Sequence, residues 1–473
     1  MALGKSDHVH LQNGRFAGTT ADDLRGAFAE FAAAPPAHGW VLHFHGGLTD
    51  RASATTTAEF LLPKYQEAGA FPLFFIWESG PWETIRNNLG DIAQEPFFQR
   101  LLKRLADYLL PKLGLTPGGA EAAESVAASE SFSDELPPPP GLAATEISET
   151  ELEREVQSDP ALEEAYRELG ARVVIADQGF TAESTGGVAG GRTAVLPSPA
   201  AQVDLFGPPG AGDPANESLG LTWAARVAIV AARVGRRVVS RFIKRRDHGW
   251  YTTIVEELLR ELYIDAIGST FFWKQMKKDT ADAFAGASDE HGGTAFLEQL
   301  RDQAAAASAA GTAPPRVTLV GHSAGAVFVS HFLLAAHRIL PPDFVFDVVL
   351  LAPAVDCELF SAAIETNRIR NVRMFAMSDA LEAKDALLRP YSPHLSNVYP
   401  RSLLYFVSGL LEAVVDLPLV GMQRYYDKAR YPGESFPVLK KVRTFLWHAP
   451  DRQVWSVAPG AGSAVRRRAP RGV

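Results

Sequence analysis

The sequence has one cysteine in 473 residues, Cys357. A lone thiol cannot form an internal disulfide, and it excludes zinc or iron–sulfur sites built from several thiolates. The amino terminus, MALGKSDHVH, has no basic segment followed by an apolar run, so we expect no signal peptide. No stretch of about 18 residues is uncharged and apolar enough to span a bilayer. A reducing cytoplasm is therefore the expected compartment.

Acidic residues exceed basic ones, but the excess is local. The formal net charge is −9, from 55 Asp and Glu against 46 Lys and Arg. Residues 121–168 contain 14 acidic residues and 2 arginines, a balance of −12, so the remainder has 41 acidic and 44 basic residues, or +3. The acidity belongs to one segment and indicates no general preference for basic partners. We expect neither a nucleic-acid partner nor a cofactor.

Apolar runs alternate with helix-like stretches in two regions, residues 1–112 and 250–455, and the composition of 47% hydrophobic and 21% charged residues can fill a substantial core. A helix is expected at 20–34, where Thr20 is a suitable N-cap. Strands are expected at 40–47, 71–77, 315–320, 346–354, 371–378 and, as the last, 439–447. Further helices are expected at 251–265, 294–310, 325–340 and 401–415. Near-continuously apolar strands separated by helices predict an α/β fold with a mostly parallel sheet covered on both faces.

A large insertion separates these two halves of the core. Residues 113–218 are acidic, rich in Ser, Pro and Ala and poor in aromatics, which predicts a partly disordered insert with one short helix at 159–173. Residues 219–249 form a basic amphipathic helix with eight Lys or Arg and no acid between Arg226 and Arg246. This helix is expected to be a cap or lid on the core, with contact to an anionic membrane surface or a lipid-like substrate as the alternative. Residues 456–473 are an irregular basic tail.

The segment VTLVGHSAGA, residues 317–326, runs from an expected strand directly into an expected helix. Its centre is Gly321-His322-Ser323-Ala324-Gly325, a GxSxG pattern. A serine on such a sharp turn has a strained backbone, and flanking glycines avoid Cβ clashes while the hydroxyl enters the cleft. The amide of Ala324 and the N-terminus of the helix would then face an oxyanion formed there. Ser323 is the candidate nucleophile.

The decapeptide resembles the serine signature of lipases and esterases in the α/β-hydrolase superfamily, and the resemblance covers roughly residues 10–112 and 250–450. It implies a second oxyanion-hole amide from a His-Gly loop after an early strand, which here is His43-Phe44-His45-Gly46-Gly47. Gly47, with Gly46, would therefore join Ala324. His43 and His45 also form an HxH pair on one face of a strand. No nearby His, Asp or Glu motif completes a metal site, so none is expected.

A triad also needs a histidine base and a carboxylate that orients it. The superfamily places the acid after a late strand, which favours Asp379 over Asp356. Two histidines follow Asp379, and the resemblance favours His448 over His394 because His448 follows the expected last strand. If 453–458 is the true last strand instead, His448 precedes it and the base position is vacant. His45 and His322 are further site candidates because they adjoin the loop and the nucleophile.

These observations predict a serine hydrolase that cleaves a carboxylic ester or thioester, on a small-molecule or lipid-like substrate, through an acyl-enzyme at Ser323. The alternative is a catalytically impaired hydrolase-fold protein that binds a membrane surface or a protein partner through the basic helix at 219–246. The segment Asp247-His248-Gly249-Trp250, at the start of the second half of the core, is expected to be a turn.

Overall fold

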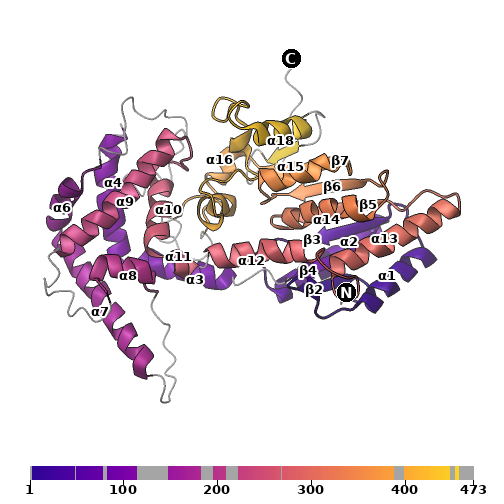
Figure 1. The fold of residues 1–473 in the computed structure, drawn as a ribbon, viewed down its shortest axis with the longest axis horizontal. Helices are drawn as coiled ribbons and strands as arrows, with labels where there is room; N and C mark the ends of the chain where they lie inside the picture. Colours follow the sequence, from indigo (N-terminus) through magenta and orange to yellow (C-terminus); the bar gives the residue numbers. More distant parts are fainter. Residues whose placement is uncertain are drawn as a thin grey trace. The chain divides into compact units, whose positions relative to one another are not determined.

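The computed structural model describes residues 3–47, 49–77, 82–113, 147–182, 195–208, 222–267, 269–387, 399–447 and 453–456 (Figure 1). The chain divides into two compact units. The first, called the sheet unit below, comprises residues 1–82, 271–383 and 417–473. The second, called the helical unit, comprises residues 83–270 and 384–416. Each unit is therefore built from segments that are far apart in the sequence.

The sheet unit is an α/β structure with one mostly parallel sheet. Within the described residues the sheet has eight strands in the order β2-β1-β4-β3-β5-β6-β7-β8. All neighbouring strands are parallel except β1 and β2, which form an antiparallel pair. The strands are β1 (His8–Gln12), β2 (Arg15–Phe16), β3 (Trp40–Phe44), β4 (Phe71–Trp77), β5 (Val317–His322), β6 (Phe346–Leu351), β7 (Ile369–Met377) and β8 (Gln453–Ser456). The carboxyl ends of the parallel strands meet at one edge, where ligands bind in open α/β sheets.

Helices cover both faces of the sheet, as the apolar strands predict. Phe75 of β4 stacks toward one face, against Phe296 and Phe328. Its neighbours Phe74 and Ile76 point the other way and pack with the buried residues of α2. The first face carries α1 (Ala21–Ala33), α13 (Gly292–Ala309) and α14 (Gly325–Ile339), and the second carries α2 (Arg51–Glu67). Side chains on both sides of β3 and β4 are thus removed from water, which explains why these two strands are almost entirely apolar.

The expected last strand at 439–447 is wrong, because these residues lie in helix α18 (Pro437–Trp447). The buried residues Leu439, Val442 and Leu446 recur at a helical period, and Phe445 meets Phe360 of α15 (Cys357–Glu365) edge-on. The last described strand, β8, comes later and pairs with β7. A nine-residue apolar stretch fits both a helix and a strand, and here the packing partner decides.

The helical unit contains most of the insertion. Residues 147–182 and 195–208 form α6 (Glu149–Gln157), α7 (Pro160–Ala182) and α8 (Pro199–Phe206), so the single expected helix is longer than predicted and has two neighbours. Their apolar residues, such as Leu152 and Leu162, are buried. The other helices of this unit are α3 (Trp82–Gln94), α4 (Pro96–Lys112), α9 (Trp223–Ile243), α10 (Trp250–Leu262), α11 (Ile264–Ile267), α17 (Leu403–Phe406) and the π-helix η3 (Val407–Leu411).

The basic helix expected at 219–249 is confirmed as α9, but its arginines have acidic partners. Arg233 pairs with Asp204 of α8 at 2.7 Å, and Arg236 pairs with Glu149 of α6 at 2.7 Å. Arg237 pairs with Glu261 of α10 at 2.6 Å. Acidic residues of the insertion and of α10 therefore balance part of the charge that the sequence of α9 leaves uncompensated. None of the helices in the described part of the chain combines the length and low charge that crossing a bilayer requires.

Candidate active site

Ser323 lies in a sharp turn between β5 and α14. Its φ of 50° is in the left-handed region, which a non-glycine residue adopts at a cost of about 1–3 kcal/mol. Three backbone hydrogen bonds hold it: its N–H donates to Leu351 O at 2.8 Å, and its carbonyl accepts from the N–H groups of Ala326 at 3.1 Å and Ala354 at 3.0 Å. The side chain is half-buried. This is the strained strand-to-helix turn that the GxSxG pattern predicts.

The glycines of the pattern allow the chain to pass close to itself. A Cβ at Gly321 would lie 2.9 Å from Gly325 O, and a Cβ at Gly325 would collide with Phe44 O at the end of β3. Side chains at either position would push β5, α14 and β3 apart. The pattern therefore has a local mechanical basis in this fold.

The loop Gly46–Gly47 after β3 lies against the serine turn. A Cβ at Gly46 would lie 3.4 Å from Ser323 Cβ, and one at Gly47 would lie 2.8 Å from Ala324 Cβ. Among the described residues, neither the Gly47 nor the Ala324 amide donates a hydrogen bond to another protein group. Buried amides without a protein partner are uncommon, and Ala324 is fully buried. Two backbone donors beside a serine hydroxyl are what an oxyanion hole requires.

Met276 of α12 (Ser269–Asp282) packs against Gly47 of this loop, and the sequence contains no signal that predicts this contact. A Cβ at Gly47 would collide with Met276 Sδ, and Met276 is only 2% exposed. The thioether therefore lies on the side of Gly47 that also faces Ala324 Cβ. A methionine side chain is flexible enough to move aside for a ligand.

His45 is buried immediately behind the loop. Its ring stacks on Trp77 with 3.9 Å between ring centroids, its Nδ1 lies 2.6 Å from Gly46 O, and its Nε2 lies 3.1 Å from Trp77 N. Burial lowers the pKa of His45 to about 4, although the hydrogen bond to the Gly46 carbonyl partly opposes this. His43 faces α2, with Nδ1 3.0 Å from the Tyr65 hydroxyl, and burial lowers its pKa to about 3. In the described residues no group of three His, Cys, Asp or Glu could hold a metal.

The two candidate acids follow the two strands that come after the nucleophile strand β5 in the sheet order, Asp356 after its neighbour β6 and Asp379 after β7. Asp356 comes after β6, where its carboxylate accepts from Leu359 N at 2.8 Å as the N-cap of α15. Asp379 comes directly after β7 as the first residue of α16 (Asp379–Glu382), and its backbone N–H donates to Gln423 Oε1 at 2.8 Å. The carboxylate of Asp356 thus already has a structural task as a helix cap.

The two candidate bases, His394 and His448, lie outside the described residues. His448 comes after α18 and before β8, so the expectation that it follows the last strand is wrong. In the described part of the chain, no histidine ring is hydrogen-bonded to the Ser323 hydroxyl. The exposed His322 adjoins the loop, with Nδ1 3.0 Å from the position of a Gly46 Cβ. The structure therefore brings together Ser323 and the two amide donors but shows no base.

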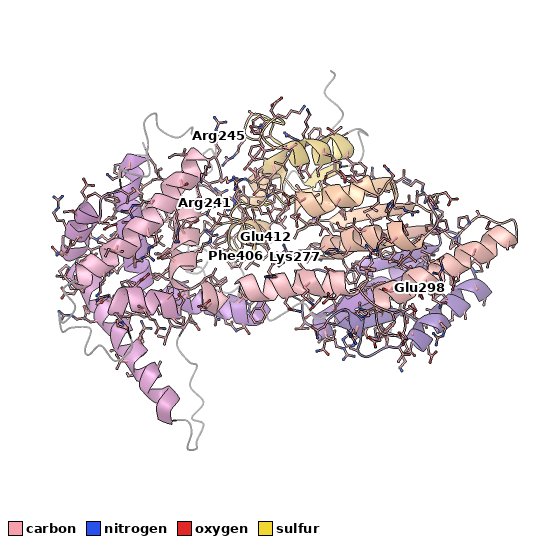
Figure 2. All side chains as sticks on the ribbon, viewed as in Figure 1. Arg241, Arg245, Lys277, Glu298, Phe406 and Glu412 are labelled. Atoms are coloured by element: carbon pink, nitrogen blue, oxygen red, sulfur yellow. The ribbon has the colours of Figure 1, made fainter. Side chains whose placement is uncertain are left out.

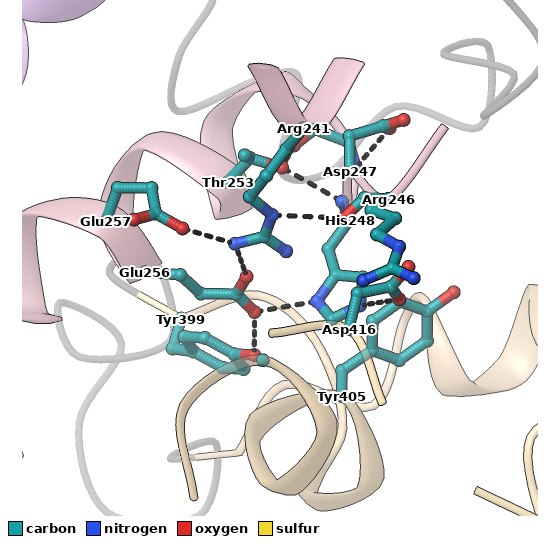
Figure 3. A network of polar contacts seen from close by, with 12 residues as sticks. Arg241, Arg246, Asp247, His248, Thr253, Glu256, Glu257, Tyr399, Tyr405 and Asp416 are labelled. Carbon is teal, nitrogen blue, oxygen red and sulfur yellow. Dashed lines mark hydrogen bonds and ion pairs between the residues drawn. The ribbon is translucent and has the colours of Figure 1, made fainter. Parts of the chain in front are cut away.

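A second polar cluster, in the helical unit, is the ionic cluster formed by Arg241, His248, Glu256, Glu257 and Asp416 (Figure 3). His248 is fully buried, with Nδ1 2.8 Å from Glu256 Oε1 and Nε2 2.9 Å from Asp416 Oδ1. Arg241, near the end of α9 (Figure 2), lies 2.7 Å from Glu256 and 3.0 Å from Glu257. The expected turn at 247–250 thus contains a buried histidine that contacts two carboxylates, which no local pattern in the sequence indicates.

Comparison of the chain with protein families, curated protein sequences and solved structures found no match. The chemistry is therefore inferred from the geometry around Ser323.

Proposed function

We propose that the sheet unit is a serine hydrolase of the α/β-hydrolase fold that cleaves a carboxylic ester or thioester through an acyl-enzyme at Ser323. The main support is the strained turn at Ser323, with φ of 50°, packed against the Gly46–Gly47 loop. The order of the parallel strands β4-β3-β5-β6-β7-β8 is also that of an α/β-hydrolase sheet. Backbone strain of this kind persists only where surrounding contacts enforce it, and such residues cluster at active sites.

In this reaction the Ser323 Oγ loses its proton to a base and attacks the carbonyl carbon. The carbonyl oxygen becomes an oxyanion that accepts hydrogen bonds from the Gly47 and Ala324 amides. Collapse of the tetrahedral intermediate releases the alcohol or thiol, which takes the proton from the base. Water then attacks the acyl-enzyme by the same route and regenerates Ser323. Because Ala324 is fully buried, neighbouring groups have to move before a substrate carbonyl can reach that amide.

Asp379 is the preferred acid, because the carboxylate of Asp356 is already used as the N-cap of α15. For the base, His448 and His394 are both kept as proposals. With β8 placed after His448, its position in the chain no longer favours it. Replacing each histidine by Gln separates the two, since only the base is needed for serine reactivity.

Labelling with a fluorophosphonate probe tests the proposal. The wild-type protein should be labelled and Ser323→Ala should not, while Ser308→Ala, an exposed serine on α13, is a matched control that should be labelled normally. On a p-nitrophenyl ester, Ser323→Ala should lower kcat by about 10⁴-fold or more. Equal labelling of wild type and Ser323→Ala would refute the assignment.

The alternative, membrane or partner binding through residues 219–246, depended on uncompensated basic residues. Arg233, Arg236, Arg237 and Arg241 pair with acidic residues, so half of these eight basic residues are compensated and the support for this alternative is weaker.

A further inference from the structure

The imidazole of His45 bridges two backbone groups at the edge of the sheet. Nε2 faces the N–H of Trp77, the last residue of β4, and Nδ1 faces the carbonyl of Gly46 in the candidate oxyanion loop. The ring is 6% exposed and stacks on the Trp77 indole at an interplanar angle of 15°. The backbone N–H and the indole ring of Trp77, which lie outside the loop, therefore hold the imidazole in position.

These contacts determine which nitrogen carries the proton. A backbone N–H can only donate, so Nε2 must accept from Trp77 with a lone pair. Burial keeps the ring neutral near neutral pH, with a pKa of about 4. The single ring proton is therefore on Nδ1, which donates to Gly46 O.

Holding the Gly46 carbonyl also orients the amide of Gly47. The peptide bond between the two glycines is planar, and the described residues contain no cis peptide. In a trans peptide the C=O and the following N–H point in opposite directions, so the Gly47 N–H points away from the His45 ring. Glycine at both positions leaves this peptide free to rotate unless a hydrogen bond fixes it.

We propose that His45 is a positioning residue whose Nδ1–H tautomer fixes the Gly46–Gly47 peptide and so preorganises the Gly47 amide as an oxyanion donor. The inference rests on the proposed hydrolase function. A fixed donor stabilises the oxyanion without reorganisation, so the effect falls on kcat and not on ground-state binding.

Two conservative variants divide the two hydrogen bonds of His45 between them. In His45→Asn the side-chain amide nitrogen takes the place of Nδ1 and can still donate to Gly46 O. In His45→Gln the amide oxygen takes the place of Nε2 and can still accept from Trp77 N–H. We expect His45→Gln to lower kcat on a p-nitrophenyl ester by about 10²-fold, the effect of losing one oxyanion donor, with KM little changed. His45→Asn should lose much less.

Equal losses of kcat in the two variants, or a change in KM with kcat unchanged, would overturn the inference. The hydrolase proposal would still stand in that case, provided that fluorophosphonate labelling depends on Ser323. Absence of that labelling in the wild type would instead overturn both. A readout on the intact wild-type protein does not depend on how the variants fold. In ¹⁵N NMR of histidine-labelled protein, His45 should show a protonated Nδ1 and an unprotonated Nε2. The opposite tautomer would overturn the inference.

Discussion

His45 in the sheet unit and His248 in the helical unit are both buried and both use both ring nitrogens, but their partners differ. His45 contacts a backbone N–H and a backbone carbonyl, at 3.1 and 2.6 Å. His248 contacts two carboxylates, at 2.8 and 2.9 Å. An N–H partner requires a lone pair on the ring, whereas a carboxylate accepts from a ring N–H. The His45 ring is therefore neutral, and the His248 ring lies between two acidic side chains.

The difference shows that the groups around a buried histidine determine whether it stabilises the fold or orients a functional group. Burial by itself would raise the pKa of the Glu256 carboxyl, but His248 and Arg241 hold it well below its ordinary value. A buried set of compensating charges stabilises the fold only when every partner is present, because removing one leaves another buried without compensation. This suits a structural role. A neutral ring between backbone groups costs little and can orient a peptide. We therefore expect mutations in the ionic cluster to lower the stability of the protein, and mutations at His45 to lower its activity.

The largest expected effect is on the ionic cluster. Glu256→Gln removes the carboxylate that His248 and Arg241 share and leaves the buried guanidinium of Arg241 without one of its two carboxylate partners, so the helical unit should lose about 3–5 kcal/mol of stability. Glu149→Gln is the matched control, because it also removes a partner of an α9 arginine but from a half-exposed pair, and it should cost less than about 1 kcal/mol. Hydrogen exchange of the α9 and α10 amides measures both. Similar losses would show that burial does not set the strength of these pairs.

A second test adds one methyl group to the loop. In Gly47→Ala the new Cβ collides with Met276 Sδ and lies 2.8 Å from Ala324 Cβ, so the loop must move away from the serine turn. We expect the rate of fluorophosphonate labelling to fall by about 10²-fold with little loss of stability. Adding Met276→Ala should restore part of the rate. If the labelling rate of the double variant stays as low as that of Gly47→Ala, the clash with Ala324, and not the clash with Met276, displaces the loop.

A third test uses pH to compare the units. His43, His45 and His331 of the sheet unit have pKa values lowered by burial to about 3, 4 and 4, from 6.5. The unfolded chain therefore binds protons that the folded unit does not as pH falls below about 6.5. Stability should fall by about 1.4 kcal/mol per pH unit for each such histidine, until pH approaches the folded pKa.

Urea unfolding of the sheet unit between pH 6.5 and pH 4.5 measures this slope before most carboxylates titrate. His43→Gln, which can keep a hydrogen bond to Tyr65, should reduce the slope by the contribution of one histidine. An unchanged slope in this variant would mean that His43 is protonated in the folded protein.

The smallest expected effect separates the two candidate acids. Asp356→Ala removes the N-cap of α15 and should cost about 1 kcal/mol of stability with kcat preserved. Asp379→Asn should lower kcat and leave stability nearly unchanged. The reverse pattern, measured by thermal unfolding and ester hydrolysis, would make Asp356 the triad acid.

Features whose cause is local could be predicted from the sequence. Thr20 begins α1 as expected, with its side chain and that of Asp23 forming a capping box. The turn at Ser323 was predictable because the glycines at 321 and 325 are needed by contacts within the same strand–turn–helix segment and its neighbour β3. By contrast, the strand predicted at 439–447 is wrong. The residues of α18 fit a strand and a helix equally well, and only the packing against α15 favours the helix.

The sequence by itself determined that the chain builds a mostly parallel α/β sheet with a serine at a strained strand end, because apolar periodicity and glycine spacing act over a few residues. The tertiary structure decided which charges are paired, since the partners of the α9 arginines come from segments up to 87 residues away. It also brought Trp77 to His45 and Met276 to Gly47. These contacts join residues that are distant along the chain, and only the packing of the strands and helices determines them.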